Sequence, residues 1–321
     1  MSIVFYLPDQ DILAQIQHVT PAQQPELYNT GVKIWIGQTY HRLKQLQVPV
    51  ALSHELPSSG LVVTHADHAH QARRALRPWQ NVVIVSLRTD RSPCRYADFE
   101  IVQNAHSAQS PRQRHVPHWP QPALQSRDPA RGTRIVNVVY KGAAPELHPQ
   151  LATLAWAEDV RQLGMTWHAD AATWVSNQQR VYEGIDWTDY TQADVILALR
   201  ANPAHLYPTK PASKLVNAWH AGVPALLGPE VAFQELRQSP LDYIEVRSAQ
   251  EALAALQRLQ ANPGLYQDMV EQGRMRAQAF TTEAIDERWQ RTLSDLAQQQ
   301  PMAPARWIRH LMALRKALPQ R

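Results

Sequence analysis

Short apolar runs rich in β-branched residues alternate along the chain with stretches whose apolar residues recur every three or four positions. The first pattern is typical of buried strands and the second of amphipathic helices. In the first 118 residues the predicted buried strands are 2–7, 48–52, 61–65, 82–87 and 99–104. Between the first two strands, Val32, Ile36, Tyr40, Leu43 and Leu46 recur at helical spacing. The pattern therefore predicts a first half of alternating strands and helices.

The same alternation returns after residue 133. Strands are predicted at 134–140, 194–200, 224–228 and 244–246, the first of them ending in a Lys141-Gly142 turn. Helices are predicted at 147–164, ending at Gly164, and at 248–280, with a break near 262–264. A last helix is expected to carry one apolar face, formed by Ile285, Trp289, Leu293 and Leu296.

A proline-rich segment separates the two halves. Residues 114–132 contain four prolines, which prevent a regular helix or a central strand, so we expect a semi-rigid connector that acts as a hinge. The predicted fold is α/β, with two Rossmann-like βαβ domains facing a central cleft and a C-terminal crossover helix. The predicted domains are 1–118, which binds the acceptor, and 119–285, which binds a nucleotide, followed by the crossover helix and a tail in 286–321.

Composition narrows the class of protein. Of the 321 residues, 44% are hydrophobic and 19% are charged, as in globular proteins, and no stretch approaches the ~18 apolar residues of a membrane span. The single cysteine, Cys94, excludes an intramolecular disulfide, and the start of the chain lacks the pattern of a signal peptide. We therefore expect a cytoplasmic protein.

The positive charge is concentrated at the C-terminal end. The net charge is +4, but residues 301–321 hold five basic residues and no acidic one, which leaves the other 300 residues at −1. This distribution argues against a nucleic-acid partner for the body of the protein. Residues 306–318 read as an imperfectly amphipathic helix, which predicts either peripheral contact with the inner face of a membrane or a helix packed on the N-terminal domain.

The segment 211–228, PASKLVNAWHAGVPALLG, predicts an anion site. Ser213 is a candidate N-cap and Lys214 lies in the first helical turn, whereas Gly222 ends the helix. The positive end of a helix dipole repels a lysine, but a bound phosphate or diphosphate would satisfy both the lysine and the free backbone N–H groups. The alternative is a solvated lysine beside an ordinary cap.

Residues 217–224, NAWHAGVP, resemble the nucleotide-sugar signature of the GT-B glycosyltransferases, in which a helix with this ending follows a strand of the C-terminal domain. The stretches 97–104 and 114–119 resemble the crossover between the domains of that family, and the Trp289 helix resembles its terminal helix. The chain also resembles a glycosyltransferase-like family that is common in cyanobacteria, from residue 1 to about residue 295. The segments that carry this resemblance are WIGQTYHRL, HWPQPAL, DWTDY, KPASKLVNAWHAGVP and LDYIEV.

The resemblance implies a metal-independent glycosyltransferase that moves a sugar from a nucleotide-sugar donor to a glycan or lipid-linked acceptor, with no cofactor. Cations must then stabilise the leaving diphosphate in place of Mg²⁺. The implied diphosphate-binding residues are Lys214, Ser213, Arg200 and Gly142, with Lys141 beside it. The alternative for Arg200 is an ion pair with Asp186 or Asp189.

Contacts to the donor ribose and sugar are implied for Asn217, Thr209 and Lys210. Many retaining members of the GT-B glycosyltransferases carry glutamates where this chain has Thr209 and Asn217. An asparagine can still accept hydrogen bonds, but without charge, so this departure leaves the stereochemical outcome open.

An inverting enzyme needs a base for the acceptor hydroxyl, and acidic residues and histidines follow the first-half strands. We predict Asp9 and Asp90 as catalytic residues, with His65 and Asp67 as further candidates. The alternative for Asp9 is an Asx turn that caps the next helix. Three arginines after strand 82–87 are expected either to hold an anionic acceptor or to be solvated; they are Arg88, Arg91 and Arg95.

Other functions stay open at this level. The stretch HADHAHQ, residues 65–71, contains histidines that could bind zinc, but a helix start with Asp67 in its first turn explains it without a metal. A nucleotide-sugar 2-epimerase would share the fold but need several carboxylates in the cleft. A non-catalytic relative that binds nucleotides or carbohydrates is the alternative from a different class, and Asn217 keeps it open.

Overall fold

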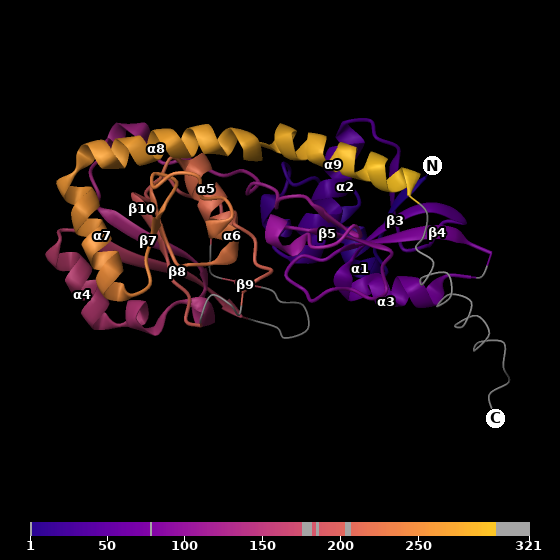
Figure 1. The fold of residues 1–321 in the computed structure, drawn as a ribbon, viewed down its shortest axis with the longest axis horizontal. Coiled ribbons are helices and arrows are strands. Elements are labelled where there is room, and N and C mark those ends of the chain that lie inside the picture. Colours follow the sequence, from indigo (N-terminus) through magenta and orange to yellow (C-terminus); the bar gives the residue numbers. More distant parts are fainter. Residues whose placement is uncertain (1, 78, 175–181, 184–185, 203–206, 300–321) are drawn as a thin grey trace, which may run out of the picture. The chain divides into compact units, whose positions relative to one another are not determined.

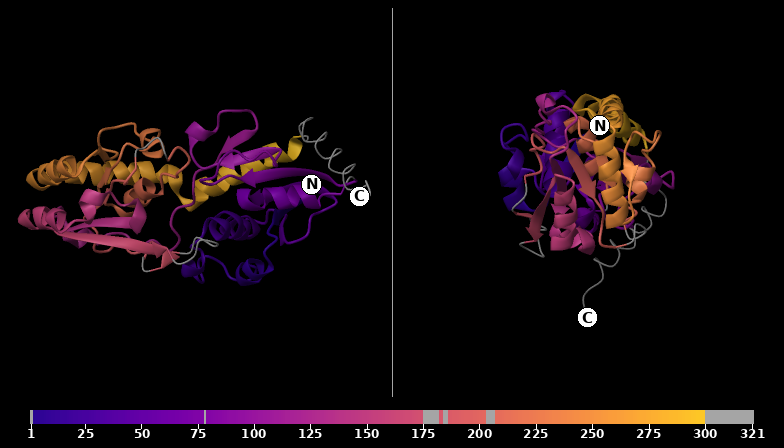
Figure 2. Two further views of the ribbon diagram at one scale, coloured as in Figure 1. Left: turned by 90° about the horizontal axis from the view of Figure 1, so that it is seen from below. Right: turned by 90° about the vertical axis from the view of Figure 1, so that its left-hand side faces the viewer.

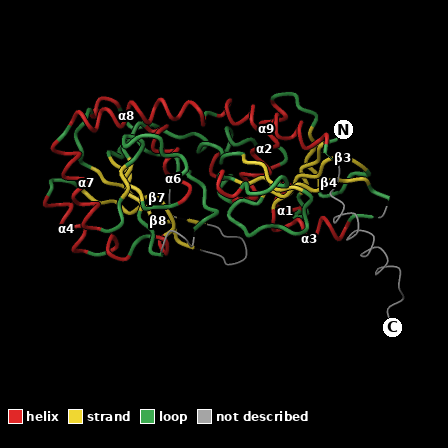
Figure 3. Tube along the Cα trace, viewed as in Figure 1, coloured by secondary structure: helices red, strands yellow, loops and turns green. Residues whose placement is uncertain are grey.

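The computed structural model describes residues 2–77, 79–174, 182–183, 186–202 and 207–299. The chain folds into two compact units. The first unit is formed by the chain up to Pro117, by Thr209–Pro211 and by the chain from Ile285 onward, and the second by His118–Pro208 and Ala212–Ala284. Figure 3 shows strands alternating with helices within each unit. The predicted tail helix at 306–318 lies outside the described residues.

The first unit contains a six-stranded parallel sheet in the order β2-β1-β3-β4-β5-β6 (Figure 1). Its strands are β1 (Ile3–Tyr6), β2 (Val50–Ser53), β3 (Ser59–His65), β4 (Asn81–Leu87), β5 (Phe99–Val102) and β6 (Gln113–His115). The strand order reverses between β1 and β3. Ligands of open α/β sheets bind outside the carboxyl ends of the strands at such a switch point.

Five predicted strands of this unit are confirmed, with two differences. The strand predicted at 48–52 was expected to be buried, but β2 is an edge strand and its residues are half-buried or exposed. The connector was expected to begin at residue 114, but Gln113–His115 pairs with β5 as a further parallel strand. The Gln113 amide donates to the Glu100 carboxylate at 2.8 Å, and the prolines that prevent a strand begin only at Pro117.

Helices complete the first unit. They are α1 (Gln10–Ile16), a π-helix (Lys33–Gln38), α2 (Thr39–Gln45), α3 (Ala66–Ala75) and α9 (Thr282–Gln298), of which the part from Ile285 belongs to this unit. The apolar face predicted for the last helix is confirmed, because all four of its residues are buried. Trp289 of α9 packs edge-on against Trp35 of the π-helix, with ring centroids 6.1 Å apart, and Figures 1 and 2 show α9 along its length.

Because of His115 on β6, we expect the stability of the first unit to fall at acidic pH. Burial, together with the Arg288 guanidinium, lowers the pKa of His115 to about 4. The unfolded chain takes up this proton below about pH 6.5, so stability that is present above that pH is lost as the pH falls towards 4. At about 1.4 kcal/mol per pKa unit, we expect a loss of roughly 2 to 3 kcal/mol.

Thermal unfolding between about pH 7.5 and about pH 4.5 checks this expectation. The variant His115→Gln should lose less stability over that range than the wild type does. The exposed His70, which stacks on Tyr96, offers the control variant His70→Gln. An equal acid loss in the wild type and in His115→Gln would show that other groups cause it.

The second unit contains a sheet in the order β12-β11-β10-β7-β8-β9, in which only β9 runs antiparallel to its neighbour. Its strands are β7 (Asn137–Ala143), β8 (Thr166–Trp174), β9 (Tyr182–Glu183), β10 (Val195–Ala198), β11 (Ala225–Leu227) and β12 (Ile244–Glu245). The four strands predicted here are confirmed, and β8 and β9 were missed. The order reverses between β7 and β10, which is the second switch point of the molecule.

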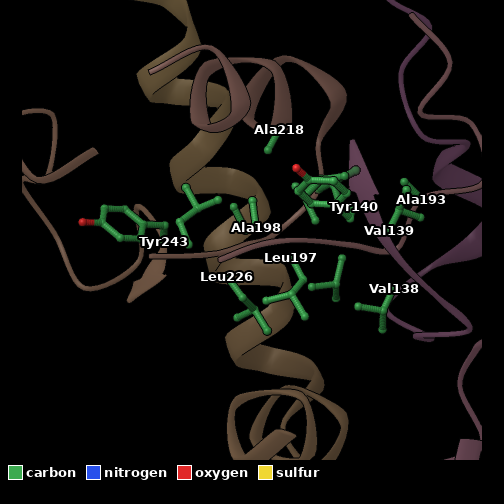
Figure 4. Packing of buried hydrophobic residues seen from close by; sticks show 14 of the residues in the cluster. Val138, Val139, Tyr140, Ala193, Leu197, Ala198, Ala218, Leu226 and Tyr243 are labelled. Carbon is green, nitrogen blue, oxygen red and sulfur yellow. The ribbon is translucent and has the colours of Figure 1, made fainter. Parts of the chain in front are cut away.

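The helices of the second unit are α4 (Leu154–Gln162), α5 (Ser213–Ala221), α6 (Val231–Gln234), α7 (Ala249–Ala261) and α8 (Pro263–Ala277). The predicted break of the long helix is confirmed, because Asn262 ends α7 and caps α8. Side chains of β7, β10, β11 and α5 meet in one core (Figure 4). Trp219 of α5 lies against Gly273 of α8, where an added Cβ would come within 2.9 Å of the indole.

A buried ionic network holds the second half of the connector to the second unit. Asp194, which is fully buried, accepts hydrogen bonds from Arg127 at 2.9 Å and from Arg131 at 2.7 Å. It also accepts from the backbone N–H groups of Val136 and Asn137, each at 2.8 Å. The segment 127–131 was expected to be a spacer, but these contacts make it part of the unit. Whether the remaining prolines act as a hinge stays a prediction.

Among the helices within the described ranges, none has the length and apolar character needed to cross a membrane.

Candidate functional site

In the second unit, β7 and β10 part at the switch point. Their pairing covers only Val138–Val139 of β7 with Val195–Ile196 of β10, while β7 continues to Ala143 beside β8. Helix α5 follows β10 and begins with Ser213 and Lys214. The Lys214 ammonium lies 5.8 Å from the ring centroid of Tyr140 in β7, and the hydroxyl of that ring donates to the carbonyl of Ala143, the last residue of the strand. A cation and a helix N-terminus therefore share the place where ligands of such sheets bind.

The predicted N-cap of this helix is wrong by one residue. Ala212 occupies the N-cap position, and Ser213 is the first helical residue. Since alanine has no side-chain oxygen, its side chain satisfies none of the N–H groups of the first turn. The predicted C-terminus is confirmed, because Gly222 ends α5 in the left-handed conformation with a φ of 68°.

Lys141 and Gly142 lie inside β7, so the turn predicted there is wrong. They pair with Asp170 and Ala171 of β8, and the strand ends only at Ala143. The Lys141 side chain is buried, and its ammonium donates to the Asp186 carbonyl at 2.8 Å and lies 5.4 Å from the Tyr190 ring centroid. Gly142 leaves room for the Tyr140 side chain, because an added Cβ at residue 142 would come within 2.3 Å of the Tyr140 hydroxyl.

Arg200, at the end of β10, is engaged by two carboxylates. Its guanidinium forms an ion pair with Glu146 and lies 2.9 Å from a carboxylate oxygen of the buried Glu230. The alternative expected from the sequence was an ion pair with Asp186 or Asp189. Arg200 does form ion pairs, but its partners are other residues, so the predicted partners are wrong. Two negative charges on one cation reduce the ability of Arg200 to attract a diphosphate.

Asn217 is nearly buried and is hydrogen-bonded within the second unit. Its side-chain oxygen accepts from the Gln121 N–H at 3.4 Å. The described contact thus gives Asn217 a role in holding Gln121, and the predicted ribose contact stays a prediction.

The carboxyl ends of the strands in the first unit gather a second group of polar side chains. Asp9 follows β1 and caps α1, accepting from the N–H groups of Asp11 and Ile12 at 3.1 and 3.0 Å. Both bonds end on the same oxygen, Oδ1, and Oδ2 accepts no hydrogen bond from any described residue. The capping alternative is therefore confirmed, and it leaves one carboxylate oxygen for another partner.

Asp90 follows β4 and carries two cationic partners. Its carboxylate pairs with Arg91 at 2.9 Å and with Lys210 at 3.3 Å. Thr209 donates to the Asp90 carbonyl, while Gln103 and Asn104 donate to the carbonyls of Thr209 and Lys210. The structure thus brings Thr209 and Lys210, which were predicted beside the donor sugar, together with Asp90 in the first unit.

The HADHAHQ stretch is occupied by structural contacts. His65 is buried at the end of β3 and caps α3, accepting from the Asp67 N–H at 3.2 Å, and its other ring nitrogen lies 3.2 Å from the Thr89 hydroxyl. The hydrogen bond from Arg91 lowers the pKa of Asp67. Within the ranges that the structure describes, no group of three or more histidine, cysteine or acidic side chains could hold a metal ion.

Sequence reasoning missed several residues of both groups. Glu146 and Glu230 follow β7 and β11, so their position after strands was a signal that could have singled them out. Gln103 and Asn104 were assigned to the end of a strand, and Gln121 to the connector. Their contacts to residues about a hundred positions away leave no trace in the local pattern.

Comparisons with known proteins identify the fold. No protein-family model matches the chain, and neither does any curated protein sequence. Anabaena HepE in complex with UDP superimposes with a TM-score of 0.58 at 14% identity, over 92% of this chain and 100% of that one. Sucrose-phosphate synthase from Thermosynechococcus elongatus gives 0.51 at 14% identity, over 74% of this chain and 73% of that one.

A third similar structure is that of the pneumococcal O-GlcNAc transferase GtfA in complex with UDP and GlcNAc. It superimposes with a TM-score of 0.54 at 14% identity, over 82% of this chain, which spans only 60% of GtfA. These three proteins are GT-B glycosyltransferases. With two Rossmann-like units built on largely parallel sheets, this chain has the GT-B fold.

Proposed function

We propose that this protein is a glycosyltransferase that takes a sugar from a nucleotide-sugar donor. The observation that carries the proposal is the Lys214 ammonium at the start of α5, near the end of β7 at the switch point of the second unit. The similar HepE and GtfA structures contain UDP, which makes UDP the first nucleotide to test. The proposed acceptor is a hydroxyl group of a glycan or a lipid-linked sugar.

In the proposed reaction the bond between the anomeric carbon and the diphosphate oxygen breaks, and a bond to the acceptor oxygen forms. The departing diphosphate keeps the electron pair of the broken bond. Lys214 and the N–H groups of the first turn of α5 would stabilise that charge, so the reaction needs no divalent metal. Lys141 in β7, whose ammonium donates to the Asp186 carbonyl, would add a second positive charge in the second unit.

Asp9 is the better candidate of the two predicted bases for the acceptor proton. Its Oδ2 accepts no hydrogen bond from the described residues, and the two N–H groups on Oδ1 hold the carboxylate in place. Asp90 lies between Arg91 and Lys210, and two cations make a carboxylate a weaker proton acceptor. We therefore assign Asp90 a positioning role for the turn that follows β4.

A panel of nucleotide sugars tests the proposal. UDP-, GDP-, ADP- and CMP-linked sugars should include one that raises the melting temperature, because a ligand of the folded state stabilises it by mass action. The same donor should be hydrolysed slowly, and Asp9→Asn should lower the turnover at least tenfold while the nucleotide still binds. If no donor of the panel binds, the proposal is wrong.

The second candidate function is a GT-B relative that binds a nucleotide without catalysis. The observation in its favour is Asn217, which stands where the resemblance to the GT-B glycosyltransferases implies a glutamate in many retaining members and which accepts a hydrogen bond from Gln121. In that case the donor panel would still give a thermal shift. Hydrolysis and transfer would both be absent, and Asp9→Asn would have no turnover to lower.

A further inference from the structure

Three arginine side chains in the described ranges are buried, and one of them differs from the other two. Arg73 on α3 donates to the buried Asp98 at 3.0 Å, and Arg127 pairs with the buried Asp194 at 2.8 Å. Arg88 is only 7% exposed, but no carboxylate of the described residues lies within ion-pair distance of it. A buried charge is costly unless a partner compensates it, so Arg88 is the exception to explain.

Arg88 directly follows β4, at the ligand-binding edge of the first sheet. Its Nε donates to the Arg91 carbonyl at 3.0 Å, which fixes the base of the guanidinium. Its two terminal nitrogens make no hydrogen bond to a described residue, and they are not enclosed, so they keep contact with solvent. The next residue, Thr89, has a φ of 52°, a conformation that a non-glycine residue rarely holds outside functional sites and turns.

The neighbouring charges do not neutralise Arg88. Arg91 pairs with two carboxylates of this edge, Asp67 at 2.7 Å and Asp90 at 2.9 Å, and Lys210 also pairs with Asp90. Arg91 and Lys210 thus occupy these two carboxylates, and neither carboxylate forms an ion pair with Arg88. Arg95, the other arginine of this loop, lies on the Tyr96 ring instead.

We propose that Arg88 binds an oxyanion of the acceptor, a phosphate or a carboxylate, and that this protein therefore selects acidic acceptors over neutral ones. A guanidinium offers paired N–H donors that match either group, and the fixed Nε leaves the terminal nitrogens for the ligand. That the bound molecule is a sugar acceptor rests on the proposed glycosyltransferase function. The anion site itself does not depend on it.

Titration calorimetry with three probes tests the inference. Glucose 6-phosphate carries a phosphate, glucuronate carries a carboxylate, and glucose carries neither. At least one acidic probe should bind the wild type tenfold or more tightly than glucose does, and the two acidic arms tell which group the site prefers. Raising the salt from about 50 to about 300 mM should weaken that binding, since salt screens charges.

Variants assign the binding to the residue. Arg88→Gln should reduce the affinity of the acidic probe to that of glucose, whereas Arg88→Lys should retain part of it. The matched control is Arg95→Gln, in the same loop, which should bind like the wild type. If Arg88→Gln does not fold, the comparison of Arg88→Lys with the wild type still decides, because a lysine lacks the paired donors of arginine.

The two proposals fail in different ways. Equal binding of glucose and the acidic probes, or an unchanged affinity in Arg88→Gln and Arg88→Lys, would overturn the anion site. UDP titrated into the same variants reports on the second unit instead, and its affinity should be unchanged. A protein that binds an acidic probe through Arg88 but binds no nucleotide sugar would retain the anion site and lose the proposed function.

Discussion

Replacing Lys214 by alanine is expected to weaken nucleotide binding about tenfold to a hundredfold, because a charge-assisted contact to phosphate is worth roughly 1.5–3 kcal/mol. Lys214 is half-buried at the first turn of α5 and makes its ring contact to Tyr140 from there. Removing it leaves the N–H groups of the helix but takes away the cation. Titration of UDP, or of the nucleotide that the panel selects, into both proteins measures the difference.

Two variants make this test specific. Lys214→Arg keeps the positive charge and should retain most of the affinity. Lys44 in the first unit also lies against a tyrosine ring, that of Tyr40, at 5.4 Å, so Lys44→Ala controls for the loss of a lysine on an aromatic ring. Equal nucleotide affinity in Lys214→Ala and in the wild type would show that Lys214 does not hold the diphosphate.

Replacing Asp194 by alanine is expected to destabilise the second unit by about 3–5 kcal/mol, since it leaves buried arginine charge without a partner. Asp194 is fully buried and joins Arg127 and Arg131 to the start of β7 through Val136 and Asn137. For a unit of this size the melting temperature should fall on the order of 10 °C. Thermal unfolding followed by calorimetry measures the shift.

The exposed pair of Glu158 and Arg161 on α4 provides the control. Glu158→Ala removes a surface ion pair of the same unit, whose charges solvent screens, so its melting temperature should barely change. A similar, small shift in both variants would show that the Asp194 network contributes little.

We also expect the stability of the second unit to depend on pH through the Asp194 carboxylate. Burial alone would raise the pKa of Asp194, but the hydrogen bonds from Arg131, two backbone N–H groups and Arg127 outweigh it and lower the pKa. The stabilisation is therefore present above the pKa of an unfolded aspartate and is lost as the pH falls below it. Asp194→Ala should show a smaller acid loss than the wild type in this range.

Local patterns in the sequence predicted most of the fold. The apolar runs predicted β1, β3, β4, β5, β7, β10 and β11, because a strand buried on both faces has a continuous apolar sequence. The spacing of Ile285, Trp289, Leu293 and Leu296 predicted the buried face of α9, since helical periodicity is itself local. In the same way, Gly222 marked the end of α5.

Only tertiary structure decided the elements whose stability comes from a distant partner. Residues 166–174 contain His168 and Asp170 and lack a strand pattern, but they form β8 by pairing with β7 along its length. Lys141 and Gly142 read as a turn, and the same pairing extends β7 through them. The connector likewise gained contacts at Asp194 that prolines in a sequence do not reveal.

The candidate sites follow the same division. The sequence by itself determined that Lys214 lies at a helix start after a strand, and that three arginines follow β4. It could not rank those arginines, because their side chains are chemically identical and differ only in what surrounds them. Folding places Arg91 on two carboxylates and Arg95 on an aromatic ring, and it buries Arg88 away from any described carboxylate. That difference arises from burial and charge pairing between segments far apart in the chain, which only the tertiary structure fixes.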